Sequence, residues 1–225
     1  MKTFILVSEK KWHLSLFDNL RKEDENHWVL INKKGDFTLD NLKKINPSKI
    51  FIPHWSYIIK EEIFSNFSCI VFHMTDLPYG RGGSPLQNLI VAGHRKTKIS
   101  ALKVTKGIDT GDIYLKKELS LLGTAEEIFI RSTKIIFIMI KEIIDHKIEP
   151  VPQEGEIFEF KRRKPADSDI SRLESIDEVF DYIRMLDAEG YPNAFIEIGN
   201  FRLEFTRANY KLTNSILADV RISEK

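Results

Sequence analysis

Hydrophobic and polar positions along the chain predict strands and helices that alternate. Apolar runs with the length of buried strands lie at residues 2–7, 28–31, 49–52 and 69–73. Stretches with apolar residues at helical spacing separate them, at residues 10–21, 39–45 and 60–64. Such alternation favours right-handed crossovers and parallel pairing. We therefore predict an α/β fold around an open, mainly parallel sheet.

The pattern changes in the second half of the chain. A long helix is predicted from the capping box Thr124–Glu127, and Pro150 and Pro152 end that module. Residues 1–152 are thus predicted to form the main domain. Residues 153–225 are predicted to form a small α+β appendage, with a strand over residues 158–163, a helix from Ser175 and a hairpin around residues 199–200.

Composition and charge narrow the class of protein. Of the 225 residues 42% are hydrophobic and 30% charged, which is typical of a soluble globular protein. Lys and Arg number 34 against 33 Asp and Glu, which predicts no nucleic-acid partner. The single cysteine, Cys69, lies in an apolar run and favours a reducing, cytoplasmic location. Charges interrupt the most apolar segment, residues 128–144, so we expect no membrane partner.

The candidate chemistry lies between residues 69 and 90. The apolar run ends at His73, and histidine is the side chain best suited to proton transfer near neutral pH. A glycine-rich loop follows, and Ser84 and Pro85 predict a helix start with a capping hydroxyl. Open α/β sheets bind ligands at the carboxyl ends of their strands. On spacing alone, however, a hydrogen-bonded structural role for His73 remains the favoured interpretation.

Two motifs resemble those of the formyltransferase family that uses N10-formyltetrahydrofolate. Residues 107–112 read Gly-Ile-Asp-Thr-Gly-Asp, which is the second motif. The first motif is matched by His73, Leu77, Pro78, Arg81, Gly82, Pro85 and Gln87. The two motifs also occur in the order and at the separation that the family shows. The resemblance implies a Rossmann-like formyltransferase fold, an enzyme with N10-formyltetrahydrofolate as cosubstrate, and no metal.

The resemblance also implies roles for individual residues. His73 would act as base or proton relay and as oxyanion partner, and Asp109 would orient it and assist proton movement. The family asparagine two residues before the histidine is replaced by Val71, which cannot donate a hydrogen bond. Asn88 would compensate only if its side chain turned back toward the site.

Binding residues are predicted in the same way. The resemblance assigns Tyr79, Gly80, Arg162 and Arg163 to substrate binding, with the arginines placed to contact a diphosphate. The pocket for the folate cosubstrate is predicted to include Trp55, Tyr57, Ile58, Ile59, Arg81 and Asp112.

The leading functional hypothesis is transfer of a formyl group to the amino group of a nucleotide-linked 4-amino-4,6-dideoxysugar. The partner would then be a sugar nucleotide, and a homodimer is compatible with the resemblance. Three alternatives stay open: a methionyl-tRNA formyltransferase, a formyltransferase for another small amine such as glycinamide ribonucleotide, and a noncatalytic protein that binds folate or a sugar nucleotide.

Overall fold

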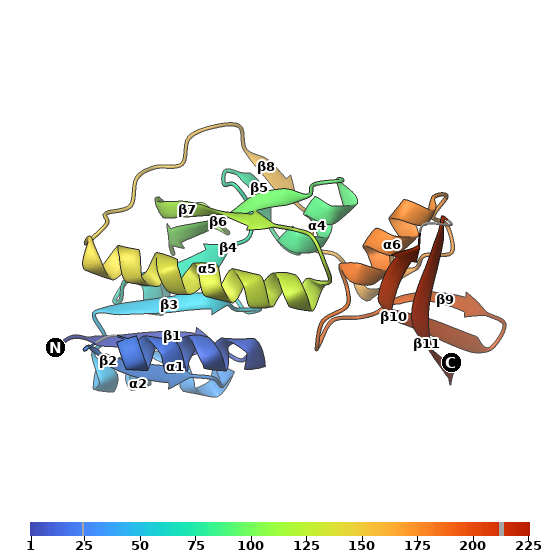
Figure 1. Ribbon diagram of the computed structural model, residues 1–225. Helices are drawn as coiled ribbons and strands as arrows, with labels where there is room; N and C mark the ends of the chain where they lie inside the picture. The colour runs from blue at the N-terminus through green and yellow to red at the C-terminus, as the bar shows by residue number, and fades with distance from the viewer. Residues whose placement is uncertain (24, 212–213) are drawn as a thin grey trace. The chain divides into compact units, whose positions relative to one another are not determined.

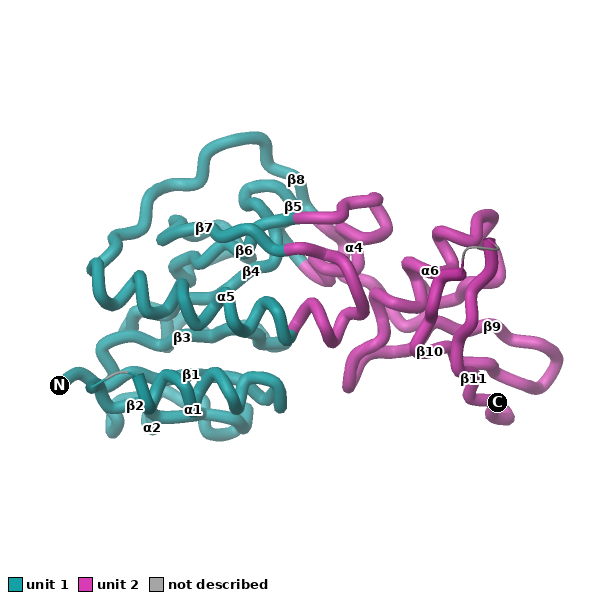
Figure 2. The backbone as a smooth tube through the Cα atoms, in the orientation of Figure 1, with its two compact units in different colours: residues 1–82, 97–119, 130–159 teal, residues 83–96, 120–129, 160–225 magenta. Residues whose placement is uncertain are grey.

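The computed structural model describes residues 1–23, 25–211 and 214–225. The chain forms two compact units, each assembled from three segments of sequence (Figure 2). Unit 1 comprises residues 1–82, 97–119 and 130–159, and unit 2 comprises residues 83–96, 120–129 and 160–225. The domain boundary at residue 152 stays a prediction.

The central sheet, which lies in unit 1 apart from two terminal residues, has six strands in the order β2-β1-β3-β4-β6-β7 (Figure 1). The β1–β2, β1–β3 and β3–β4 pairs are parallel, and the β4–β6 pair is antiparallel. The predicted Rossmann-like, mainly parallel fold is therefore confirmed. The strands are β1 (Thr3–Ser8), β2 (His27–Ile31), β3 (Lys49–His54), β4 (Cys69–His73), β6 (Lys96–Lys103) and β7 (Ile113–Ser120).

Helices connect these strands where the apolar spacing predicted them. They are α1 (Leu14–Glu23), which follows the 3-10 turn η1 (Lys11–His13), α2 (Leu39–Ile45) after η2 (Lys34–Asp36) and α3 (Glu61–Phe64). The long helix α5 (Ala125–Asp145) follows the last strand of the sheet, β7. The Thr124 hydroxyl accepts from the Glu127 N–H and the Glu127 carboxylate accepts from the Thr124 N–H, as the capping box predicted. In the described part of the chain, no helix is long and apolar enough to cross a membrane.

Continuous apolar strands form the core of unit 1, as expected for parallel strands with both faces covered. Ile5, Ile50 and Cys69, from three neighbouring strands, belong to one buried cluster. Burial raises the pKa of the Cys69 thiol to about 12, which keeps it protonated and unreactive at neutral pH. The sheet is thus a rigid support for the groups at its carboxyl edge.

Unit 2 contains the small α+β appendage. Its three-stranded antiparallel sheet has the order β11-β10-β9, and Ser175 and Glu178 form the predicted capping box of α6. The sequence did not predict β11. The elements are α4 (Pro85–Val91), η3 (Pro165–Ser168), α6 (Ile176–Arg184), β9 (Ala194–Ile198), β10 (Phe201–Lys211) and β11 (Ser215–Glu224).

The glycine-rich loop after β4 differs from the prediction in two respects. It contains a short strand, β5 (Tyr79–Gly82), which pairs with β8 (Phe158–Phe160). Pro85 does begin α4, but the Ser84 side chain does not cap it: Ser84 has φ 53°, and its hydroxyl accepts from the main-chain N–H of Arg163 over 3.1 Å. The left-handed backbone turns that side chain away from the helix end.

Candidate active site

The candidate site begins at His73, the last residue of β4. Its Nε2 donates a hydrogen bond to the main-chain oxygen of Gly80 over 2.7 Å, and the Thr75 hydroxyl donates to the same oxygen over 3.3 Å. Gly80 has φ 78°, a backbone conformation that favours glycine. Because a carbonyl oxygen can only accept, Nε2 must be the protonated nitrogen of the ring.

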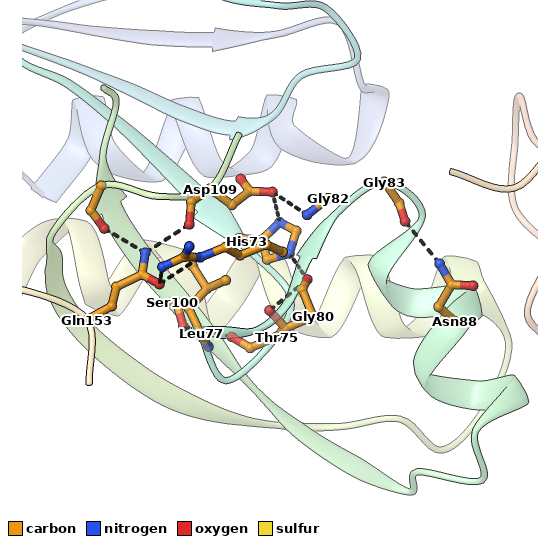
Figure 3. A network of polar contacts seen from close by, with 12 residues as sticks. His73, Thr75, Leu77, Gly80, Gly82, Gly83, Asn88, Ser100, Asp109 and Gln153 are labelled. Atoms are coloured by element: carbon orange, nitrogen blue, oxygen red, sulfur yellow. Dashed lines mark hydrogen bonds and ion pairs between the residues drawn. The ribbon is translucent and has the colours of Figure 1, made fainter. Parts of the chain in front are cut away.

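Asp109 lies beside the other ring nitrogen. Its Oδ2 is 3.4 Å from Nδ1 of His73 and accepts a hydrogen bond from the main-chain N–H of Gly82 over 2.9 Å. Figure 3 shows the carboxylate between the imidazole and Gly82. Both side chains are largely buried, with 9% of the imidazole and 15% of the carboxylate side chain exposed. The two predicted catalytic residues therefore share one environment.

This geometry determines which nitrogen can exchange a proton. With the Nε2 proton bonded to Gly80, the neutral ring of His73 presents its lone pair at Nδ1. A proton taken up there makes the ring a cation directly beside the Asp109 carboxylate, which stabilises it through a charge-assisted hydrogen bond. The pair can accept and hold a proton, as general base catalysis requires.

The loop that carries Asp109 needs its glycines for steric reasons. Asp109 itself has φ 55°, a left-handed conformation that costs a residue with a side chain about 1–2 kcal/mol. A Cβ on Gly111 would collide with the main-chain oxygen of Lys103 in β6. The motif at residues 107–112 thus packs its backbone against the sheet and turns the carboxylate toward His73.

Gln153 connects this loop to Arg81. Its Nε2 donates to the main-chain oxygens of Asp109 over 2.8 Å and Gly111 over 2.7 Å. Its Oε1 accepts from Nη2 of Arg81 over 2.8 Å and from Nε over 3.2 Å. Sequence reasoning missed Gln153, whose only signal is a polar side chain directly after Pro152 in a supposed linker.

Neither Val71 nor Asn88 supplies an oxyanion donor. Val71 packs against two apolar clusters on β4. The Asn88 amide lies in unit 2 and donates to the main-chain oxygens of Gly83 over 3.0 Å and Lys161 over 2.9 Å. Because both amide protons are used, the suggested turn of Asn88 toward His73 is not observed.

The predicted folate residues after β3 divide into two kinds. Trp55 and Ile59 pack on the core cluster of unit 1, with the Trp55 ring 5.6 Å from that of Phe37. Tyr57 and Ile58 are exposed, by 38% and 84%. Tyr57 and Ile58 follow β3 at the carboxyl edge of the sheet. The Tyr57 ring lies edge-to-face against the Trp55 ring, with 5.1 Å between the ring centroids, and this contact holds Tyr57 in place.

The remaining predicted residues lie in several places. Asp112 is half-buried directly before β7, and its main-chain oxygen accepts from Lys103. The Tyr79 ring stacks on Phe158 at 5.2 Å. In unit 2, Arg162 is exposed, whereas the guanidinium of Arg163 lies over the Tyr182 ring and donates to the main-chain oxygen of Asp167. The two arginines are therefore not equivalent.

Among the described residues, no three His, Cys, Asp or Glu side chains come together in a group that could hold a metal ion.

Comparisons with known proteins identify the family to which the sequence and the fold are similar. Residues 20–130 match the family model "Formyl transferase", and residues 165–223 match "Methionyl-tRNA formyltransferase, C-terminal domain". The solved structure of methionyl-tRNA formyltransferase from Clostridium thermocellum is 52% identical, with a TM-score of 0.98 and 100% of each chain covered. The methionyl-tRNA formyltransferase of Clostridium botulinum is 28% identical over 77% of this chain, which spans 59% of that relative's length.

More distant structures share only the fold. HypX from Aquifex aeolicus, solved in complex with tetrahydrofolic acid, is 15% identical with a TM-score of 0.76, over 91% of this chain and 37% of that chain. A sugar N-formyltransferase from Shewanella sp. is also 15% identical, with a TM-score of 0.69, over 100% of this chain and 98% of that one.

These findings correct two predictions. The sugar-nucleotide function is wrong, because the chain that is 52% identical over its full length is a methionyl-tRNA formyltransferase, while the sugar enzyme shares only the fold. The prediction of a sugar-nucleotide partner and no nucleic acid is wrong for the same reason. It relied on the charge of the whole chain and on a tail that instead matches the methionyl-tRNA formyltransferase C-terminal model.

The predicted formyl donor, N10-formyltetrahydrofolate, is confirmed at the level of the family. With the matched motifs, the fold and a full-length relative in agreement, this chain belongs to the formyltransferase family.

Proposed function

We propose that this chain transfers a formyl group from N10-formyltetrahydrofolate to the amino group of methionyl-tRNA. The main support for this substrate is the 52% identity to a methionyl-tRNA formyltransferase over the whole of both chains. The match of residues 165–223 to the C-terminal model of the same enzymes supports it independently. The reaction takes place in the cytoplasm, where charged tRNA is used.

The chemistry rests on His73 and Asp109. Formyl transfer forms a bond between the amine nitrogen and the formyl carbon, breaks the bond from that carbon to N10 of the folate, and moves one proton from the amine to N10. Nδ1 of His73 accepts the amine proton, and Asp109, at 3.4 Å, stabilises the resulting cation until the proton passes to N10.

Residues of unit 1 provide surfaces for the folate. Tyr57 and Ile58 present exposed apolar surface directly after β3, backed by the partly buried Trp55. Arg81 offers a cation from β5, and Asp112 offers a carboxylate at the start of β7. Apolar walls with a few polar groups are typical of sites for small ligands.

Two features suit a nucleic-acid substrate. The first is the cluster Lys161–Lys164, here called the basic run, whose Arg162 is exposed and available to phosphate oxygens. The second is Phe158, which is 50% exposed and stacks on Tyr79, a surface on which a base can stack.

The test is a transfer assay with a panel of amines. Purified protein is incubated with N10-formyltetrahydrofolate and methionyl-tRNA, free methionine or glycinamide ribonucleotide, and formylated products are detected by mass. We expect formylmethionyl-tRNA and little product from free methionine, which lacks the nucleic acid. Formylation of another amine in preference to methionyl-tRNA would overturn the substrate, and folate binding without any product would favour the noncatalytic role that Val71 suggests.

A further inference from the structure

We propose that Gln153 is a positioning residue that sets the place of both Asp109 and Arg81. Figure 3 shows the Gln153 amide beside the main chain of Asp109, to which it donates. The same amide accepts from the guanidinium of Arg81 on its other side. The kinetic part of this proposal rests on the proposed function, whereas its structural part does not.

The hydrogen bonds of Gln153 fix the orientation of its amide. Two main-chain oxygens, those of Asp109 and Gly111, face Nε2 and can only accept, while the guanidinium of Arg81 faces Oε1 and can only donate. A flipped amide would put oxygen against oxygen and nitrogen against a cation. The side chain therefore has one orientation that fits, and in it both protons of Nε2 are bonded.

The backbone that carries Gln153 is itself held to the sheet. Val151 forms an antiparallel bridge with Ile113, with hydrogen bonds of 2.8 Å and 2.9 Å in the two directions. Pro150 and Pro152 stiffen this segment by fixing φ. The segment predicted as a linker thus fixes Gln153 beside the 107–111 loop.

Asp109 is a residue that needs such support. Its loop is mostly exposed, with Gly107, Ile108 and Thr110 all on the surface, and Asp109 holds a left-handed φ of 55°. Without Gln153, the main-chain oxygens of Asp109 and Gly111 would lose this amide, and the carboxylate would keep only its contacts with Gly82 and His73. The bonds of Thr110 to Thr105 and Lys106 lie within the exposed loop and do not tie it to Arg81. We infer that removing the amide lets the carboxylate move away from Nδ1 of His73.

Two variants separate the two sides of the amide. Gln153→Glu keeps an oxygen acceptor for Arg81 but sets a carboxylate against the oxygens of Asp109 and Gly111. We expect kcat to fall by about 10- to 100-fold, because small displacements of a reacting group have effects of that size, with the KM for the folate unchanged. Gln153→Met removes both sets of bonds and should lower kcat and also raise that KM.

The matched control is Glu154→Ala, at an exposed neighbouring position. It should leave both kinetic constants unchanged. A double-mutant cycle with Asp109→Ala then tests whether Gln153 acts through Asp109. If it does, Gln153→Glu adds no further loss of kcat in the Asp109→Ala background, whereas independent losses that multiply would overturn the proposal.

A spectroscopic measurement keeps the test independent of activity. Nitrogen-15 NMR of the histidine rings, with the His73 signals assigned through a His73→Gln variant, reports on the contact of Nδ1 with Asp109. We expect Gln153→Glu and Gln153→Met to shift the His73 signals in folded protein, and Glu154→Ala not to. Unchanged His73 signals in both Gln153 variants would overturn the proposal. Shifted signals in a protein whose wild type formylates no amine would support it while refuting the proposed function.

Discussion

At the scale of single residues, the chemistry depends on which nitrogen of one imidazole is free. Gly80 accepts the Nε2 proton of His73, so Nδ1 faces Asp109 with its lone pair. A main-chain oxygen thus selects the tautomer, and a carboxylate stabilises the protonated form. Val71, at the position of the family asparagine, packs in apolar clusters and offers no side-chain donor for an oxyanion.

The carboxylate is tested by Asp109→Asn. The neutral amide cannot stabilise a cationic His73, and we expect kcat to fall by about 100- to 10,000-fold, the usual range for loss of acid–base assistance. Steady-state kinetics measure this, with Asp112→Asn as the matched change in the same motif. Asp112→Asn should raise the KM for the folate and leave most of kcat. Equal losses of kcat in the two variants would contradict the distinct role of Asp109.

A second residue-scale prediction concerns Cys69. Its thiol is buried on β4 and burial raises its pKa to about 12, so the thiolate that reacts with disulfide reagents is scarce. We expect no reaction with such a reagent in the native protein at neutral pH and one thiol per chain after unfolding in denaturant. Rapid labelling of the native protein would contradict the burial of this strand.

At the scale of elements, the buried His13 and the partly buried His54 lie near the carboxyl ends of β1 and β3. The Ser8 hydroxyl and Nδ1 of His13 are 2.7 Å apart, and the His13 ring is 6.5 Å from that of His54. Burial, then the nearby His54 and Lys10, lowers the pKa of His13 to about 3. Burial, then Lys10, lowers the pKa of His54 to about 4.

These shifts predict a loss of stability in mild acid. The unfolded chain binds protons on both histidines below about pH 6.5, whereas the folded chain does not until about pH 4 or 3, so stability falls as pH drops through that window. From about pH 7 to about pH 5 we expect the free energy of unfolding to decrease by roughly 2 kcal/mol per histidine. Denaturant titrations of wild type and His54→Gln measure it, and the variant should lose less stability. An equal pH slope in the two proteins would contradict the lowered pKa of His54 in the folded protein.

The elements also show what the sequence can and cannot predict. Patterns of local spacing predicted β4 and α2 with their observed ends, because each buries one continuous apolar run or stripe. β5 was missed, because its sequence Tyr-Gly-Arg-Gly is typical of a loop and its partner β8 lies about 80 residues further along the chain. Gln153 was missed for a similar reason, since it bonds main-chain oxygens of a distant loop. The motif residues His73 and Asp109 could be identified from the sequence, because the resemblance to the family supplied their spacing.

At the scale of the whole molecule, the predicted partner was wrong because the net charge sums over all residues and hides local clusters. The formal net charge of +1 is a sum over 225 residues and hides four adjacent cations in the basic run. Nucleic acids are attracted mainly by charges within about 10 Å of their phosphates, because salt screens charges that are further away. A near-neutral chain can therefore still bind tRNA.

The exposed arginine of the basic run provides the corresponding test. Arg162→Ala should weaken binding of methionyl-tRNA and reduce the slope of log affinity against log salt by about 1, as expected for one lost phosphate contact. Filter binding over a range of salt concentrations measures both quantities. Lys33→Ala, an exposed cation of unit 1, serves as the control. The same salt slope in wild type and Arg162→Ala would remove this residue from the tRNA interface.

The central claim is that His73 takes the proton from the attacking amine while Asp109 stabilises it. The most direct measurement is the single-turnover rate of formyl transfer from N10-formyltetrahydrofolate to methionyl-tRNA, compared between wild type and His73→Asn at saturating substrates. We predict a loss of about 100- to 10,000-fold in the variant, with folate binding retained. A variant that transfers formyl groups at the wild-type rate would contradict the account.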